Sequence, residues 1–496
     1  MAINDVFSPV FVPSPLDPED WEAFRAEAHR LLDACVDQLS AARDRPWRPL
    51  SEADKSTLRL GEAGTGIGSA ALVDELAQHV LPFHTGNTHP RFFGWVHGTG
   101  LASGLLSEMV AATMNSNCGG RDHGAVYVER EVIEWCRRTF GLPETASGLL
   151  VAGTSQATVI ALAAARLKAL GPESRHAGIH DAPPLAAYAV KGVHNATVKA
   201  LELLGLGSSA LRTIPAGPDG GIDLVRLAEA VAKDRAAGVR PFCVIATAGS
   251  VDLGYFDDIE LVADLCAQED LWLHVDGAFG AWARLAESPW RELTRGIERA
   301  DSIGFDFHKW MYVQYDCGVV LIRDQSVHRQ AFAARPAYLA KQSEGIGGGE
   351  PWYCDYGTDL SRGFRALKVW SALRGYGREA LGQAITRNCK LAARMAKCVE
   401  TVGFRLAAPV RLNVCCFSAA PADWDGAEQD TLNERITHRL QLAGEVVFST
   451  TRIDGRTVIR AAIVNHRTCE ADIDYAIAAV ERAKGLEAQA PIPASA

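Results

Sequence analysis

The stretch Asp301-Ser-Ile-Gly-Phe-Asp-Phe-His-Lys-Trp310 contains the lysine around which the rest of the chain is organised. A short apolar run leads into it and a second one, Gly318–Ile322, follows, so the pattern predicts a buried strand, a loop and a return strand. Burial beside His308 and Trp310 would make the Lys309 amine a better nucleophile toward an aldehyde. A surface lysine is the better interpretation of these ten residues alone, and only upstream features overturn it.

Composition sets the class of protein. The 496 residues are 48% hydrophobic and 22% charged, which is typical of a globular enzyme with two or three domains. The net charge of −10 and the lack of a Lys/Arg-rich run argue against nucleic acid or an anionic membrane as a partner. The sequence shows no signal peptide and no apolar run of membrane-spanning length. The 12 cysteines are dispersed, which favours reduced thiols and a cytoplasmic location.

The order of predicted elements indicates an α/β fold. Helical and strand patterns alternate between residues 125 and 325, which predicts a mostly parallel sheet covered by helices. Residues 14–45 predict a helix capped by Asp17 with Pro18 at its first position, and such an arm could lie on a partner subunit. Ligands of parallel sheets bind where the carboxyl ends of the strands meet.

Four segments are expected along the chain. They are an N-terminal helical segment (1–90), a large domain (91–375), a small α+β domain (376–485) that includes a strand at Val446–Ser449, and a disordered tail (486–496). The glycine-rich residues 334–358 fit a mobile lid or a functionless insertion about equally well.

Residues at the expected strand ends supply an anion site and a buried acid. Thr154 and Ser155 lie between a strand and a helix, where free N–H groups and hydroxyls suit a phosphate, although a simple helix cap fits too. Asp276 ends an apolar strand and needs a cationic partner such as a protonated pyridine nitrogen; a capping aspartate is the alternative. Ala278 is small enough for a flat ring to lie against it.

Two histidines complete the set. His194 follows a strand and could stack on the other face of such a ring, although a lone histidine is more often an ordinary loop residue. His308 could reach the phosphate while Lys309 forms a Schiff base. Together these strand ends predict pyridoxal 5'-phosphate (PLP) bound through Lys309. We expect no metal site, because the histidines between 79 and 97 have no carboxylate or thiol at ligand spacing. The glycines of 61–68 follow no strand, which argues against a dinucleotide loop.

At this point the chain resembles the group II PLP-dependent amino-acid decarboxylases. The resemblance runs from about His89 to beyond residue 465, and its specific motifs are His89-Pro-Arg-Phe-Phe, Leu271–Phe279, Ala300–Trp310 and Leu360–Trp370. It implies a PLP fold-type I large domain, an N-terminal arm, a small C-terminal domain and a homodimer with active sites shared between the subunits.

The resemblance also implies roles for single residues. Lys309 matches the Schiff-base lysine, Asp276 the partner of the pyridine nitrogen, and His194 the stacking histidine. The phosphate-contacting positions and the position under the ring are matched by Thr154, Ser155, His308 and Ala278. Tyr338 matches the lid tyrosine that protonates the intermediate after CO₂ leaves.

The chain departs from the family pattern in several places. Asp306-Phe-His-Lys replaces Asn-Pro-His-Lys, which argues against a phosphate contact from position 306, and Gly363 replaces a frequent arginine. Ser250-Val251 replaces Thr-Thr, which leaves Ser250 as the remaining hydroxyl near the cofactor. The expected substrate pocket comprises Trp95, Val96, His97 and Asn117, and these positions differ from the apolar and aromatic residues of the family. Asn117 is expected to come from the partner chain.

These features predict a PLP-dependent carboxy-lyase that converts an L-α-amino acid to its amine and CO₂. Trp95 favours an aromatic substrate, whereas Arg91 and Arg121 keep an acidic amino acid open. An aldehyde synthase is an alternative, although that outcome often goes with phenylalanine at the position of Tyr338. A silent homologue with a binding or regulatory role is the non-enzymatic alternative.

Overall fold

The computed structural model describes residues 16–44, 47–60, 64–334 and 344–488. The chain divides into two compact units, Met1–His89 and Pro90–Ala496, which are described separately here. The expected tail begins at 486, and most of it lies outside the described residues. None of the helices in the described ranges combines the length and apolar character needed to cross a bilayer.

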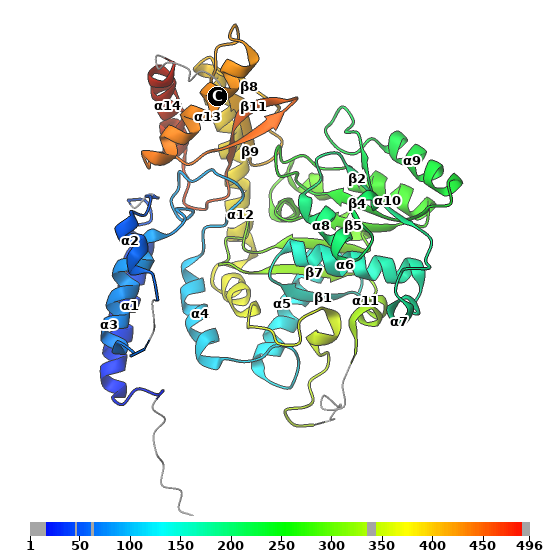
Figure 1. The fold of residues 1–496 in the computed structure, drawn as a ribbon, viewed down its shortest axis with the longest axis horizontal. Helices are drawn as coiled ribbons and strands as arrows, with labels where there is room; N and C mark the ends of the chain where they lie inside the picture. Colours follow the sequence, from blue (N-terminus) through cyan, green and yellow to red (C-terminus); the bar gives the residue numbers. More distant parts are fainter. Residues whose placement is uncertain (1–15, 45–46, 61–63, 335–343, 489–496) are drawn as a thin grey trace, which may run out of the picture. The chain divides into compact units, whose positions relative to one another are not determined.

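The N-terminal unit is a set of short helices around α1 (Trp21–Ser40) (Figure 1). Asp20 caps α1, accepting hydrogen bonds from the N–H groups of the next turn, so the prediction of a cap at Asp17 is wrong. An ion pair of 3.1 Å between Arg30 and Asp74 joins α1 to α3. The remaining helices are α2 (Glu52–Thr57), α3 (Gly68–Glu75), η2 (Leu76–Val80) and η3 (Leu81–Phe83).

A seven-stranded sheet in the order β1-β7-β6-β5-β4-β2-β3 is the centre of the second unit. All its neighbouring strands are parallel except β7, which is antiparallel to both β1 and β6. This confirms the predicted α/β fold. The strands are β1 (Ser147–Val151), β2 (Leu185–Val190), β3 (Leu211–Ile214), β4 (Arg240–Thr247), β5 (Trp272–Asp276), β6 (Ser302–Asp306) and β7 (Gly318–Ile322).

Helices cover both faces of this sheet (Figure 1). Alternate residues of one strand face opposite cores: Leu149 packs with α6 and α8, whereas Leu150 packs with the core that contains α5, α9 and α10. The helices of this layer are α4 (Ala102–Met114), α5 (Gly124–Phe140), α6 (Thr154–Leu170), α7 (Ser174–Ala177), α8 (Asn195–Leu203), α9 (Leu224–Ala236), α10 (Ile259–Gln268) and α11 (Gln325–Phe332). Short 3-10 turns connect them: η4 (Ser208–Ala210), η5 (Gly280–Leu285), η6 (Arg291–Thr294), η7 (Ile297–Arg299) and η9 (Tyr353–Tyr356).

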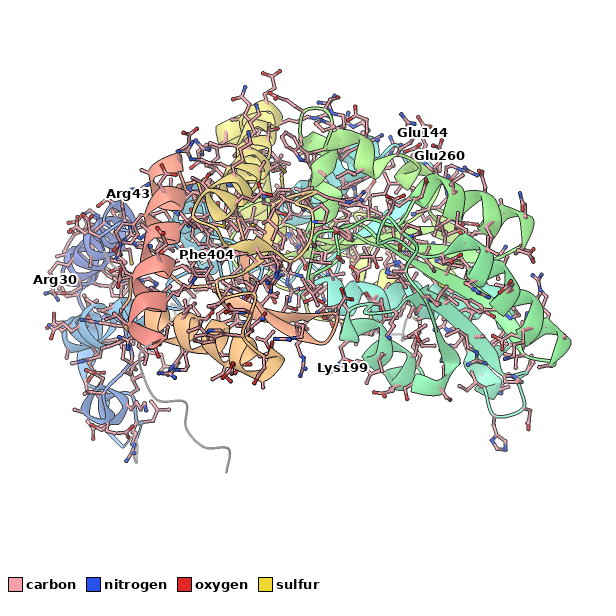
Figure 2. The ribbon with its side chains drawn as sticks, turned by 90° about the horizontal axis from the view of Figure 1, so that it is seen from above. Arg30, Arg43, Glu144, Lys199, Glu260 and Phe404 are labelled. Atoms are coloured by element: carbon pink, nitrogen blue, oxygen red, sulfur yellow. The ribbon has the colours of Figure 1, made fainter. Side chains whose placement is uncertain are left out.

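A smaller antiparallel sheet in the order β10-β11-β9-β8 has its own core, in which Phe404 packs (Figure 2). The helix α12 runs through residue 375, the expected end of the large domain, and leaves helical geometry only at Gly377 (φ 78°). The strand expected at Val446–Ser449 is shifted and begins at Ser449. The elements are α12 (Ala366–Thr401), β8 (Arg405–Leu406), β9 (Val414–Ser418), α13 (Gly426–Leu442), β10 (Ser449–Ile453), β11 (Arg456–Ala462) and α14 (Glu470–Glu487).

Candidate active site

The sheet brings the predicted site residues to one edge. The backbones of Thr247 and Asp276 pair with each other at the carboxyl ends of β4 and β5. At the next strands, Gly318 pairs with Val151 of β1 on one side and with Asp306 of β6 on the other. Residues that follow these strands therefore gather at a single edge, as the sequence predicts.

Lys309 lies just beyond the end of β6 and is mostly buried, with 24% of its side chain exposed. Its Nζ is 2.8 Å from Oδ2 of Asp306, which is itself buried. The nearby Nε2 of His308 is 3.7 Å from the same oxygen. The interpretation of Lys309 as an ordinary surface lysine is therefore wrong.

Asp276 is buried at the end of β5 and accepts a hydrogen bond of 3.2 Å from the N–H of half-buried Ala278. Burial raises the pKa of this carboxyl group, and the charge of Lys309 opposes the shift. Within the described ranges no cation lies at ion-pair distance from Asp276. A buried acid with one hydrogen bond has room for a cationic group from a ligand.

The start of α6 has the features of an anion cup. Oγ1 of Thr154 is buried and, among the described residues, without a hydrogen-bond partner. Ser155 is exposed, so its hydroxyl is also accessible. Nδ1 of His308 accepts a hydrogen bond of 3.0 Å from the N–H of Cys317, which fixes the ring. Burial lowers the pKa of His308, so the imidazole is neutral at pH 7.

Other predicted cofactor residues have local partners. His194 is exposed and caps α8, because its Nδ1 accepts a hydrogen bond of 3.2 Å from the N–H of Ala196. Oγ of Ser250 accepts one of 3.1 Å from the N–H of Tyr255. Sequence reasoning missed Thr247, whose buried Oγ1 lacks a partner among the described residues. A polar residue ending the apolar strand β4 is the signal that could have found it.

The loop from Trp95 to Gly98 lies against the lysine. A Cβ atom at Gly98 would come within 2.0 Å of the carbonyl oxygen of His308, so the two backbones are in direct contact. The ring of His97 stacks on Trp95 with centroids 5.5 Å apart and meets the edge of Tyr315 at 6.1 Å.

Tyr315 is a second residue that sequence reasoning missed. Its ring lies 4.4 Å from that of His308, measured between centroids. An aromatic residue in the loop between Lys309 and β7 was the available signal. Burial lowers the pKa of His97, and the charge of Lys309 lowers it further. Val96 is buried.

One predicted pocket residue, Asn117, is not brought to Lys309. Asn117 is exposed, and its Oδ1 accepts hydrogen bonds from the N–H groups of Gly119 (2.9 Å) and Arg362 (3.1 Å). It therefore belongs to another cluster within this chain. Tyr338 lies outside the described residues.

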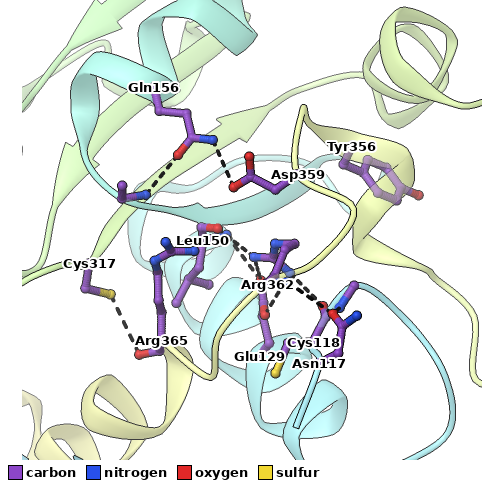
Figure 3. Close-up of polar contacts among 12 residues, drawn as sticks. Asn117, Cys118, Glu129, Leu150, Gln156, Cys317, Tyr356, Asp359, Arg362 and Arg365 are labelled. Carbon is purple, nitrogen blue, oxygen red and sulfur yellow. Dashed lines mark hydrogen bonds and ion pairs between the residues drawn. The ribbon is translucent and has the colours of Figure 1, made fainter. Parts of the chain in front are cut away.

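That second cluster is built on Arg362 (Figure 3). Its guanidinium forms an ion pair with Glu129 of α5 and donates hydrogen bonds to the carbonyls of Cys118 (2.8 Å) and Leu150 (2.6 Å). Both side chains of the ion pair are only 1% exposed. This pair anchors the segment before α12 to the sheet. Arg362 of the Leu360–Trp370 motif therefore supports the fold.

A nucleophilic lysine, a buried acid on the adjacent strand and an open anion cup define a protein that binds a phosphorylated aromatic aldehyde. The hydroxyl of Thr154 and the carboxyl group of Asp276, which lack a hydrogen-bonding and an ion-pair partner respectively among the described residues, fit the two ends of PLP.

Comparison with known proteins agrees with this class. The family described as "Pyridoxal-dependent decarboxylase conserved domain" matches residues 67–420. An aromatic-L-amino-acid decarboxylase of Bacillus atrophaeus is 32% identical, with 90% of this chain and 92% of that protein aligned. A phenylacetaldehyde synthase of Arabidopsis thaliana is 26% identical over 90% of this chain and 93% of its own. A crystal structure of Oryza sativa TDC with PLP and tryptamine superposes with a TM-score of 0.87 at 26% identity, covering 95% and 99% of the two chains.

The chain belongs to the pyridoxal-dependent decarboxylase family. It is therefore a PLP-dependent amino-acid decarboxylase by class, and PLP is its cofactor.

Proposed function

We propose that the protein decarboxylates an aromatic L-amino acid to the corresponding amine and CO₂. The observation that carries this proposal is the set of rings of Trp95, His97 and Tyr315, which is held beside Lys309 by the contact of Gly98 with the backbone of His308 and Lys309 and by the contact of Tyr315 with His308. An aromatic substrate can pack against such rings at favourable edge and stacking distances. The neutral imidazole of His97, which makes no hydrogen bond within the described residues, can bind a polar ring substituent.

The arginines that an acidic substrate would require are engaged elsewhere. Arg91 donates a hydrogen bond of 2.9 Å to the carbonyl of Glu445 and lies over the ring of Tyr475. Arg121 lies over the ring of Trp352, 5.8 Å from its centroid. These contacts favour the aromatic substrate over an acidic one.

Each site residue then has a distinct task. PLP, when bound, withdraws the electrons that CO₂ leaves at Cα. Lys309 would bind the aldehyde group, and Asp276 would keep the ring nitrogen protonated. His194 and Ala278 would hold the ring between them. The residues that would bind the phosphate are Thr154, Ser155, Ser250 and His308.

We also propose a homodimer. The helix α4 exposes four apolar side chains, Leu106, Met109, Val110 and Met114, each 43–61% exposed. A second copy of this chain that covers α4 would also bring Asn117, which follows this helix, toward the partner's site. Sedimentation equilibrium should give twice the mass of the chain, and a monomer would contradict the proposal. A cytoplasmic location stays a prediction.

The substrate is tested by measuring CO₂ release from a panel of amino acids, with the product identified by mass. We expect the highest kcat/KM for an aromatic substrate and a rise in KM with Trp95→Ala. The matched control is Trp370→Ala, because Trp370 contacts Arg374 instead of this ring set. Preference for glutamate or aspartate would overturn the aromatic substrate. Release of no CO₂, despite absorbance that borohydride abolishes, would favour the silent homologue.

The lid tyrosine decides between amine and aldehyde. Tyr338 is proposed to deliver a proton to Cα, which gives the amine. Tyr338→Phe should then suppress the amine and divert product to the aldehyde by oxidative deamination, in which O₂ is the oxidant and ammonia and hydrogen peroxide are released. Unchanged amine output would remove Tyr338 from the mechanism.

A further inference from the structure

One carboxylate connects the anion cup to the lysine. Asp306 is 1% exposed, and its two oxygens have different partners. Oδ1 accepts a hydrogen bond of 2.7 Å from the N–H of Thr154, the first residue of α6. Oδ2 lies 2.8 Å from Nζ of Lys309. The side chain is therefore fixed from both ends.

The backbone around Asp306 leaves this carboxylate little freedom. A Cβ atom at Gly318 would lie 2.6 Å from Oδ1, and one at Gly153 would lie 3.6 Å from it. The oxygen thus fits closely between two glycines that lie on the neighbouring strand and at the start of α6. A rigid acceptor holds the flexible lysine stem better than a mobile one.

The helix can be capped without the charge of Asp306. An uncharged amide oxygen could also accept the hydrogen bond from the N–H of Thr154, although more weakly than a carboxylate. A negative charge at this position also repels the phosphate that the same helix terminus would bind. The group that gains most from the charge is Lys309, because both members of its hydrogen bond to Asp306 are ions.

We propose that Asp306 is a positioning residue that holds the ammonium group of Lys309 at the strand edge whenever this lysine is not bonded to the cofactor. The inference rests on the role of Lys309 in the proposed function. It implies two opposing effects of one charge: the free lysine is held in place, and affinity for the phosphate is reduced.

The test compares Asp306→Asn with wild type in the full-length chain. After removal of PLP with hydroxylamine, free amines are reductively methylated and the modification of Lys309 is followed by mass spectrometry. An ammonium bound to a carboxylate offers no lone pair, so we expect Lys309 to react about tenfold faster in the variant, as for the loss of one hydrogen bond to a charged group. Asp316→Asn is the control, because Asp316 lies in the loop between Lys309 and β7 but pairs with Arg365. It should react at the wild-type rate.

A second measurement uses cofactor binding. The ratio of the affinities for PLP and for unphosphorylated pyridoxal should rise in Asp306→Asn, because a repelling charge beside the phosphate is gone. A purely structural role would lower both affinities together. Equal methylation rates and an unchanged ratio would overturn the proposal.

Two controls keep these outcomes distinct. Borohydride reduction of the wild-type holoenzyme should leave a pyridoxyl group on Lys309; its absence would overturn the proposed function as well as this inference. If Asp306→Asn does not fold, Lys309→Met serves instead. It leaves Asp306 without its counter-ion, so the urea midpoint of the cofactor-free chain should fall. An unchanged midpoint would overturn the role of Asp306.

Discussion

The Arg362 cluster and the Lys309 cluster are both buried and charged, yet their polar atoms are satisfied to different degrees. Arg362 has a carboxylate and two carbonyls as partners, all from the same chain. Beside Lys309, the hydroxyls of Thr154 and Thr247 have no partner within the described residues. Asp276 has one hydrogen bond and no ion pair there.

The difference separates stability from function. Buried polar groups are nearly always hydrogen-bonded, so a set of orphan atoms at one sheet edge marks a place that a ligand completes. In the buried ion pair of Arg362 and Glu129, opposite charges meet and only the Nε of Arg362 lacks a partner among the described residues, so this pair needs no ligand and holds the fold together. Mutations in the Lys309 cluster should therefore reduce activity, and mutations in the Arg362 cluster should reduce stability.

The largest effect is expected from Arg362→Met. The variant leaves Glu129 buried without its counter-ion, which destabilises proteins by about 3–5 kcal/mol. Urea unfolding of the cofactor-free chain measures the change. Adding Glu129→Gln should restore part of the loss. If the double variant is no more stable than the single one, the unpaired charge is not the cause.

Asp276→Asn should show the opposite pattern. Loss of the charge that we propose stabilises the protonated ring nitrogen should lower kcat by about 10²–10³-fold. Because burial raises the pKa of Asp276, removal of the charge should leave the unfolding free energy unchanged or higher. The decarboxylation assay and urea unfolding give both values. Retained activity with reduced stability would mean that Asp276 supports the fold and not the reaction.

The sequence predicted the main sheet well because its strands are short apolar runs. The bounds of the predicted return strand Gly318–Ile322 agree with those of β7. The prediction of a strand at Val446–Ser449 was wrong for the opposite reason. The edge strand β10 has the polar sequence Ser-Thr-Thr-Arg-Ile, so an apolar run was the wrong signal.

The partners of the site residues could not be predicted in the same way. Arg362 and Glu129 are 233 positions apart, and no local pattern connects them. The grouping of Thr154, Asp276 and Lys309 could be predicted, because each follows or ends a strand and a parallel sheet brings such ends together. The contact of Asp306 with Lys309 depends on side-chain direction in the loop, which the sequence does not specify.

Gly318→Ala tests how closely the Lys309 cluster is packed. The new methyl group would lie 2.6 Å from both Oδ1 of Asp306 and Cα of Gly153. Overpacking of this degree costs about 1–3 kcal/mol, so PLP affinity should fall roughly tenfold. Gly363→Ala is the matched control, since its Cβ would meet nothing within 4 Å. Absorbance titration with PLP measures both variants, and equal affinities would show that the cup tolerates the displacement.

The smallest effect is expected at His328. Both of its ring nitrogens are hydrogen-bonded within the chain, so it is a structural residue like Arg362. Nδ1 is 2.8 Å from Oγ of Ser147, and Nε2 is 2.7 Å from the carbonyl of Tyr356. Burial lowers the pKa of His328 from its usual 6.5 to about 3. Above pH 6.5 the native and unfolded chains are both neutral here, and the full stability is present. As the pH falls toward 3, the unfolded chain binds a proton that the native one excludes, so stability is lost.

His328→Gln removes this titration. The variant starts less stable at pH 7.5, because glutamine does not reproduce both hydrogen bonds. The gap to wild type should narrow by about 1.4 kcal/mol for each pH unit below 6.5. Urea midpoints at pH 7.5, 6.5 and 5.5 measure it. A gap that stays constant across this range would mean that His328 takes up its proton in the native state, and that burial does not hold the ring neutral.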